Sequence, residues 1–207
     1  MSIVYMDVPP RVASMSSIAA AQVSHRDRLV TAAARFTAEN GWAELTMAKL
    51  ADLVGVSRQT VYNEIGGKPR LAEAMVLREL ELFLQVVDSA FYDNPDDLVG
   101  AIEAASFRVL ELARTDPLLH AILSSSQGAD SELLPLLTTN SEPLLGIAAQ
   151  MIRGHLETYE VHLEEHRIDV LIDMVVRLVL SHVMQPTAQP AETAETIAWI
   201  AERVLSG

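Results

Sequence analysis

The sequence predicts an all-α protein of about nine helices, in which a helix-turn-helix head of three helices precedes a larger helical body. Half of the 207 residues are hydrophobic, and helix-favouring residues dominate while runs rich in β-branched residues are short. Capping residues, prolines and glycines also divide the chain into segments of helical length. The composition and these helix-boundary residues therefore both indicate helices in most of the chain.

The first three helices are each expected to begin at a capping side chain and to end at a glycine. The caps are Ser24, Thr46 and Ser57, and the glycines are Gly41, Gly55 and Gly66. Residues 1–23 contain Asp7 and a Pro-Pro pair and lack the cationic start and apolar run of a signal peptide. They are expected to form a flexible N-terminal arm.

Six further helices are expected after the head. Lys68-Pro69 opens a long fourth helix, and Asn94 and Asp116, each followed by a proline, cap the fifth and the sixth. The seventh covers about 141–159, the eighth about 163–184 and the ninth about 192–205. The segment around Pro135 is ambiguous and fits a short extra turn.

Residues 47–63 have the pattern of a helix-turn-helix unit. Ala51 is the small residue needed where two short helices cross closely, and Gly55 is free to adopt the positive φ of a tight turn. Polar side chains would project from the second helix, as in proteins that insert this helix into the major groove of DNA. They are Arg58, Gln59, Thr60, Tyr62 and Asn63. An ordinary solvated helix face is the alternative.

The segment LTMAKLADLVGVSRQTVYNEIGGKPRL, residues 45–71, resembles the DNA-binding head of the tetracycline-repressor (TetR) family of bacterial transcriptional regulators. The matching positions are Thr46, Ala51, Gly55, Val56, Ser57, Thr60, Tyr62, Lys68 and Leu71. The part TVYNEIGGK is also similar to actinobacterial members linked to alkane or fatty-acid metabolism. The resemblance implies a ligand-responsive regulator, most often a repressor, with a DNA-binding domain at 24–70 and an effector-binding, dimerising domain at 71–207.

The resemblance also implies DNA contacts for eight residues. Phosphate contacts are expected for Thr46, Ser57, Tyr62 and Lys68, and base contacts for Arg58, Gln59, Thr60 and Asn63. The chemistry agrees, since Arg suits guanine, Gln and Asn suit adenine, and the Thr methyl suits thymine. Glu64 departs from the family, which often has a histidine there. It is interpreted as a local ion pair with Lys68 or Arg70, or as an acceptor for a cytosine amino group.

The formal net charge of −13 is unevenly distributed along the chain. Residues 1–70 hold eight basic and six acidic side chains, a net charge of +2, whereas the other 137 residues carry −15. Salt screens charges over about 10 Å at 0.1 M ionic strength. An acidic body therefore need not prevent a near-neutral head from binding DNA.

Several function classes are disfavoured by composition. The absence of cysteine excludes disulfides and thiolate metal sites and fits a reducing cytoplasm. Asp173 and Arg177 interrupt the most apolar stretch, 170–184, which is too short to cross a bilayer. A soluble, cytoplasmic protein with no catalytic residues, cofactor or resident metal is therefore expected.

The enzymatic alternative rests on HLEEH at 162–166, which matches the H-x-x-E-H pattern of zinc-dependent hydrolases. His162 and His166, four residues apart, would share a helix face as zinc ligands, with Glu165 as the base. A metal-sensing site and the solvated start of a helix are the other interpretations, and the last is favoured.

If the family architecture holds, the fourth to eighth helices surround a pocket for a small, largely hydrophobic effector. The candidate lining residues are Phe83, Phe107, His120, Met151, His155 and Met174. The last two helices carry more apolar surface than one packed face needs, which predicts a dimeric four-helix bundle. The candidate interface residues are Leu171, Val175, Leu178, Ile197, Trp199, Ile200 and Val204. Such a dimer would present two recognition helices to a palindromic DNA operator.

Overall fold

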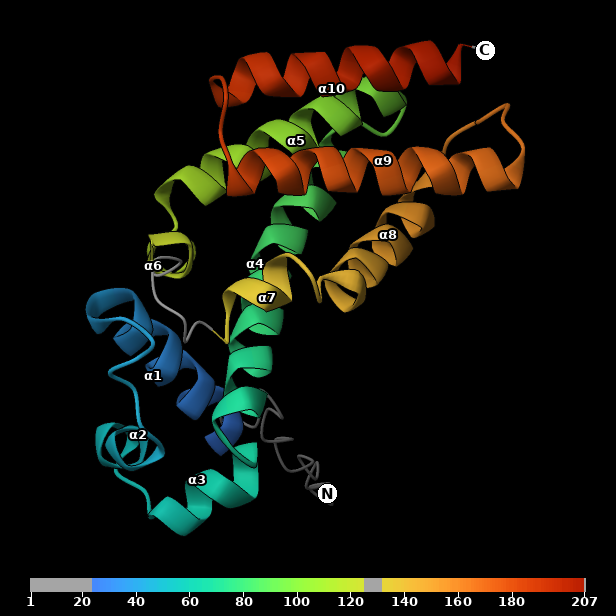
Figure 1. Cartoon of the computed structure of the whole chain (residues 1–207). Coiled ribbons are helices and arrows are strands. Elements are labelled where there is room, and N and C mark those ends of the chain that lie inside the picture. The colour runs from blue at the N-terminus through green and yellow to red at the C-terminus, as the bar shows by residue number, and fades with distance from the viewer. Residues whose placement is uncertain (1–23, 125–131, 207) are drawn as a thin grey trace, which may run out of the picture.

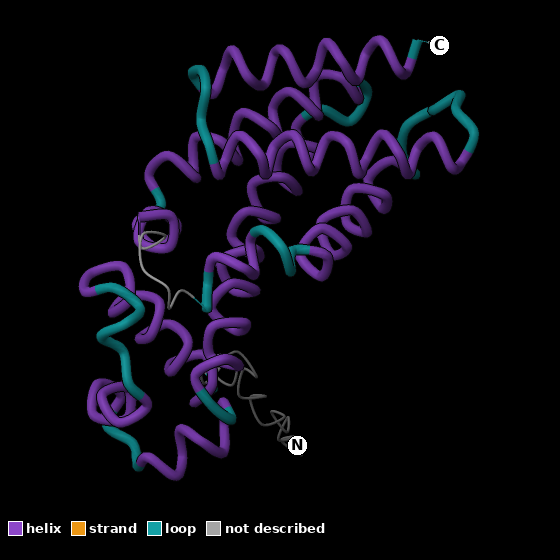
Figure 2. The backbone as a smooth tube through the Cα atoms, in the orientation of Figure 1, coloured by secondary structure: helices purple, strands orange, loops and turns teal. Residues whose placement is uncertain are grey.

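The computed structural model describes residues 24–124 and 132–206, and in these residues the chain forms ten α-helices and no strand (Figures 1 and 2). The helices are α1 (His25–Asn40), α2 (Met47–Val54), α3 (Arg58–Ile65), α4 (Lys68–Asp93), α5 (Leu98–Thr115), α6 (Pro117–Ser124), α7 (Leu134–Leu137), α8 (Glu142–Leu156), α9 (Glu165–Met184) and α10 (Pro190–Leu205). The predicted all-α fold is confirmed, and the ambiguous segment around Pro135 is the single turn α7. The predicted arm at 1–23 lies outside the described residues.

Helices α1 to α3 begin at the capping residues that the sequence predicts. The hydroxyls of Ser24, Thr46 and Ser57 accept hydrogen bonds from the backbone N–H three residues later, at 3.0, 3.1 and 3.0 Å. These bonds satisfy donors that a helix N-terminus would otherwise leave unpaired. The three helices then pack around fully buried Leu29, Leu50 and Val61.

Helix α4 is the longest in the fold and connects the head to the body (Figure 1). Its first turns bury Leu71 and Met75 in the same cluster as α1 to α3. Its last turns bury Val87 and Phe91 in a second cluster that includes α5, α8 and α9. One continuous helix therefore links the two apolar cores.

The body is built on α5, which packs against α4 on one side and α10 on another. Helices α9 and α10 lie across the end of the molecule far from α3, and α8 packs on α9 (Figure 1). A third apolar cluster joins Ile102 of α5, Leu171 of α9 and Ile197 of α10. Among the described residues, no helix is both long enough and apolar enough to span a membrane.

Three predicted helix starts are shifted, and one of them is that of α9, which begins at Glu165, two residues after the predicted start. Asn94, expected to cap α5, instead closes α4 by donating from its side-chain amide to the carbonyl of Ala90 at 2.8 Å. Asp97 caps α5, since its carboxylate accepts from the N–H of Gly100 at 2.8 Å. Helix α10 begins at Pro190, two residues before the predicted start, because proline fits the first helical position.

Candidate nucleic-acid interface and apolar cavity

One face of helix α3 packs against the core of the head, and the opposite face is exposed. Val61 is completely buried and Ile65 is 3% exposed, and both pack into the core shared with α1, α2 and α4. The polar residues predicted to contact DNA lie on the remaining surface. Arg58, Gln59, Tyr62 and Asn63 are exposed, and Thr60 is half-buried. The structure thus brings all five side chains together on one short helix.

The turn between α2 and α3 depends on Gly55, whose φ is 73° and ψ is 39°. The N–H groups of Gly55 and Val56 both donate to the carbonyl of Ala51, at 2.9 and 3.0 Å. Ala51 is 1% exposed, so the small side chain lies where the helices meet. The predicted roles of these residues in the turn agree with this geometry.

Replacing Gly55 by alanine is expected to lower the free energy of unfolding by about 1–2 kcal/mol, because a Cβ disfavours left-handed backbone. A Cβ at this position meets no other atom within 4 Å, so the backbone conformation is the whole cause. Gly146, inside α8 and equally uncrowded, is the matched control. Gly146→Ala should raise stability by about 0.5–1 kcal/mol. Urea unfolding of both variants measures the difference, and equal shifts would contradict this account.

Two polar pairs order the exposed surface of α3. The Ser57 hydroxyl caps the helix and lies 2.9 Å from the hydroxyl of Thr60. The side-chain amide of Gln59 donates to that of Asn63 at 2.8 Å, one helical turn away. Thr46 caps α2 in the same way. The helix N-termini beside Thr46 and Ser57 carry partial positive charge, which favours an anion such as phosphate.

Lys68 is positioned by Trp42, a residue that was not predicted from the sequence to belong to the site. Its Nζ donates to the backbone carbonyl of Trp42 at 3.1 Å and lies 4.6 Å from the centroid of the indole ring. Trp42 itself is 4% exposed. The start of α4 is therefore joined to the loop between α1 and α2, while the ammonium group keeps donors for another acceptor.

Glu64 does not form the predicted local ion pair. Its side chain is exposed and makes no ion pair with any described residue, and Lys68 is occupied by Trp42. Its backbone carbonyl accepts from the guanidinium of Arg26 at 2.9 Å. Arg28 similarly donates to the carbonyl of Val54 at 3.2 Å. Two arginines of α1 thus satisfy carbonyls at the C-terminal ends of α2 and α3.

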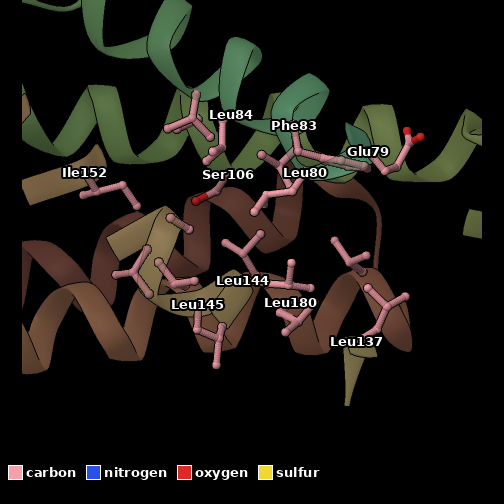
Figure 3. Close-up of a pocket in the computed structure, with 18 of the residues that line it drawn as sticks. Glu79, Leu80, Phe83, Leu84, Ser106, Leu137, Leu144, Leu145, Ile152 and Leu180 are labelled. Atoms are coloured by element: carbon pink, nitrogen blue, oxygen red, sulfur yellow. The ribbon is translucent and has the colours of Figure 1, made fainter. Parts of the chain in front are cut away.

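A cavity of about 180 Å³ lies in the body and is lined by residues of α4 to α9 (Figure 3). Almost every lining side chain is aliphatic or aromatic, and only Glu79 and Ser106 bring polar groups. Such a space favours an apolar small molecule, because apolar surface transferred from water is stabilised by about 25 cal/mol per Å².

Of the six residues predicted to line a pocket, only Phe83 lines this cavity. Phe107 and Met174 do not line the cavity, and their side chains are 40% and 41% exposed. His120 is exposed, and Met151 packs in the cluster around Phe91. His155 stacks on Phe91 at a centroid distance of 4.8 Å and pairs with Asp88 at 3.1 Å. Sequence periodicity did not distinguish the cavity face from the neighbouring faces of these helices.

The predicted interface residues fall into buried, half-buried and exposed groups in the structure. Leu171 and Ile197 are 3% and 2% exposed, because they pack in the same apolar cluster within the chain, and Val175 lines the cavity. Leu178, Ile200 and Val204 are half-buried. Trp199 is 56% exposed, with the guanidinium of Arg203 5.9 Å from its ring. Exposed apolar side chains on α9 are Val170, at 54%, and Met174.

The zinc-binding face of the disfavoured enzymatic alternative, at 162–166, is not formed. Helix α9 begins at Glu165, so His162 lies in the preceding loop and does not share a helical face with His166. Glu165 and the nearby Asp169 both pair with Arg153. Within the described residues, no cluster of three or more potential metal-ligating side chains occurs.

Two family models match the chain. The model described as bacterial regulatory proteins of the tetR family covers residues 29–75, and the model described as the C-terminal domain of the bacterial tetracyclin repressor covers residues 97–203. A curated relative, the HTH-type transcriptional regulator AlkX of Mycobacterium tuberculosis, is 27% identical over 173 residues. These are 84% of this chain and 81% of that protein.

Solved structures share the fold. The TetR family repressor AlkX from Dietzia sp. strain DQ12-45-1b, implicated in biodegradation of n-alkanes, has a TM-score of 0.71 and 23% identity, covering 88% of this chain and 96% of that one. The transcriptional repressor QsdR of R. erythropolis, also of the TetR family, has a TM-score of 0.57 and 18% identity, covering 87% and 94%.

Proposed function

Because the chain belongs to the TetR family of bacterial transcriptional regulators, we propose that it is a repressor that binds a palindromic operator as a homodimer. We also propose that a small, largely hydrophobic effector releases it. The likeness to the curated AlkX and to the AlkX structure from Dietzia confirms the resemblance to alkane-linked members that residues 60–68 indicate. The observation that carries the DNA-binding proposal is the polar, exposed face of α3, anchored by buried Val61 and Ile65.

In this proposal, residues 24–70 are the DNA-binding domain, residues 71–207 the effector-binding and dimerisation domain, and residues 1–23 an arm. Arg58, Gln59, Thr60 and Asn63 contact bases, and Thr46, Ser57, Tyr62 and Lys68 contact phosphates. Six of these residues are exposed on and beside α3, and Thr60 and Lys68 are half-buried, which supports these roles. The hydrogen bond from Lys68 to the carbonyl of Trp42 supports a preorganised phosphate contact. A side chain that is already ordered loses less conformational entropy when DNA binds.

The likeness to AlkX of Dietzia, itself implicated in n-alkane biodegradation, supports an aliphatic effector for this chain. The apolar cavity supports the same choice. The effector must bind one conformation better than another, since equal affinity for both shifts no equilibrium.

Two helices are placed to carry the signal from the cavity to the head. Helix α4 lines the cavity with Val76 and also packs this residue in the head cluster. Helix α6 packs against α1, and its Ile122 belongs to both the cavity lining and the head cluster. Displacement of either helix by the effector would alter the spacing of the two heads in a dimer.

Fluorescence anisotropy with DNA from beside the protein's own gene, against shuffled DNA across a salt series, tests DNA binding. Sequence-selective binding that weakens steeply with salt is expected, because phosphate contacts release counterions. Equal binding to both DNAs at every salt concentration would contradict the proposal.

Arg58→Ala and Tyr62→Phe should have different effects on DNA binding. Loss of a base contact relaxes the preference at one base pair by about 1–3 kcal/mol, whereas loss of a phosphate contact weakens binding to all sequences about evenly. Arg35→Ala is the control, because Arg35 is exposed on α1 and pairs with Glu39 at 2.9 Å. Binding to operators substituted at single positions measures the preference. Unchanged selectivity in Arg58→Ala would remove Arg58 from the base contacts.

A further inference from the structure

Ser106 of α5 brings a hydroxyl into the middle part of the apolar cavity. The residues of α5 that line the cavity run from Ile102 to Val109, and both of these side chains are apolar. Ser106 lies about one helical turn, or roughly 4–6 Å, from each of them. Figure 3 shows it among apolar side chains, between Leu84 and Leu145 in this view. A molecule that fills the cavity therefore has carbon on both sides of this hydroxyl.

The hydroxyl of Ser106 has no hydrogen-bond partner. The residue is 2% exposed, and its side chain makes no hydrogen bond with another described residue. A hydroxyl inside a helix can donate to the carbonyl one turn earlier, as that of Thr196 does to Glu192 at 2.9 Å, but Ser106 makes no such bond. A buried hydroxyl without a partner is unfavourable, and a ligand atom that pairs with it removes the penalty.

The hydroxyl of Ser106 is open to the cavity, whereas Oε1 of Glu79, the other polar lining residue, is not. Among the described residues, the unpaired side-chain oxygens that protein encloses completely are those of Thr37 and Oε1 of Glu79, and the Ser106 hydroxyl is not one of them. Because Ser106 lines the cavity and is otherwise buried, its open surface faces the cavity. Glu79 lies at the margin of the lining, apart from Ser106 (Figure 3).

The chemistry around Ser106 favours an uncharged acceptor on the ligand. Among the described lining residues there is no lysine, arginine or histidine, so nothing beside Ser106 would neutralise a buried negative charge. A carbonyl oxygen accepts the proton of the Ser106 hydroxyl and leaves no donor unpaired. An alcohol differs, because two hydroxyls joined by one hydrogen bond still leave one O–H without an acceptor. A ketone or ester carbonyl therefore fits this position best.

We propose that Ser106 binds a carbonyl oxygen inside the carbon chain of the effector, so that the cavity selects aliphatic ketones or esters whose carbonyl lies near the middle of the chain. This inference rests on the proposed function, since it names the chemical class of the effector. The hydroxyl of Ser106 donates to the carbonyl oxygen. The two alkyl arms extend in opposite directions along the apolar lining, where burial of their surface supplies most of the binding free energy.

The size of the cavity suits a ketone of medium length. A volume of about 180 Å³ holds roughly a dozen water-sized groups, at about 10–15 Å³ each. Undecan-6-one, with about as many non-hydrogen atoms, is a suitable probe. Undecan-2-one is its isomer with the carbonyl near one end, and undecane lacks the carbonyl. Because the two ketones have the same atoms and nearly the same apolar surface, a difference between them reports the position of the carbonyl.

Headspace gas chromatography above a solution of the full-length protein measures the free concentration of each ligand, and hence its dissociation constant. Undecan-6-one is expected to bind about three- to tenfold more tightly than undecan-2-one, the range that one hydrogen bond contributes. Equal binding of the two isomers, or tighter binding of undecan-2-one, would overturn the proposal. The absence of undecan-6-one binding up to its solubility limit would overturn it as well.

Ser106→Ala should bring the affinities of the two ketones to within about twofold of each other, because it removes the hydroxyl, and alanine keeps the helix. Undecane should bind this variant at least as tightly as it binds the unchanged protein. Ser181→Ala is the matched control, since Ser181 is exposed on α9. An unaltered preference in Ser106→Ala, its loss in Ser181→Ala, or equal weakening of all three ligands by Ser106→Ala would show that Ser106 does not bind the carbonyl.

Operator binding is measured separately. If undecan-6-one binds with the expected preference and leaves operator affinity unchanged, its proposed role in releasing a repressor fails, and the contact with Ser106 stands. If operator binding is selective and neither ketone binds, the contact with Ser106 fails, and the proposed regulator remains.

Discussion

Phe91→Ala is expected to lower the free energy of unfolding by about 3–5 kcal/mol, the usual cost of truncating a buried aromatic side chain. Phe91, in the last turn of α4, is 4% exposed and packs in a cluster with residues of α5, α8 and α9. Its ring stacks on His155 at 4.8 Å and meets the edge of Tyr159 at 6.2 Å. The hydroxyl of Tyr159 also donates to the carbonyl of Asn94 at 2.7 Å. Removing the ring therefore leaves the side chains of His155 and Tyr159 without their packing partner.

The adjacent Tyr92 provides a sharp control, since it is 84% exposed. Tyr92→Ala should change the free energy of unfolding by less than about 0.5 kcal/mol. Chemical denaturation of the two variants and the unchanged protein measures both effects. Because Phe91 also lines the cavity, the truncated variant should have a larger pocket. A loss below about 1 kcal/mol in Phe91→Ala would mean that the core collapses around the missing ring.

Trp199→Lys is expected to dissociate the proposed dimer and to reduce operator affinity by about 10²–10⁴-fold, because two linked heads bind far more tightly than one. Trp199 is the large hydrophobic residue that α10 leaves exposed, at 56%. A lysine there places an ammonium group where an interface would have to exclude water. Met174→Lys on α9 tests the same interface from a second helix, since Met174 is 41% exposed.

Sedimentation velocity gives the oligomeric state, and anisotropy with a two-half-site operator gives the affinity. Tyr92→Lys introduces the same charge at a more exposed position of α4 and should leave both measurements unchanged. If both lysine variants on α9 and α10 stay dimeric, the interface is formed by another part of the surface.

The helix-turn-helix head was predictable from the sequence because its determinants are local. Ser57 and the N–H that it caps are three residues apart, and Gly55 and its acceptor Ala51 are four apart. Such interactions depend on residue type and spacing alone. The exposure of Arg58 and Tyr62 likewise follows from the burial of Val61 between them on the same helix.

The site details that depend on distant contacts were not predictable. Lys68 meets Trp42, 26 residues away, and this contact leaves Glu64 without the local partner expected from spacing. Burial, and after it Asp116 at the junction of α5 and α6, raises the pKa of Glu79 to about 7. No periodicity in the sequence relates these pairs.

The sequence by itself determined that this protein is helical, where most of its helices begin and end, and which short helix presents polar side chains. Only the tertiary structure decided which apolar faces enclose the cavity and which remain exposed. Helical periodicity identifies an apolar face but does not state what covers it. Leu171 and Trp199 were both predicted at a dimer interface, yet Leu171 is buried by α5 and α10, and Trp199 faces outward. That difference arises from the packing of helices against one another, because each covers a surface that belongs to a distant part of the chain.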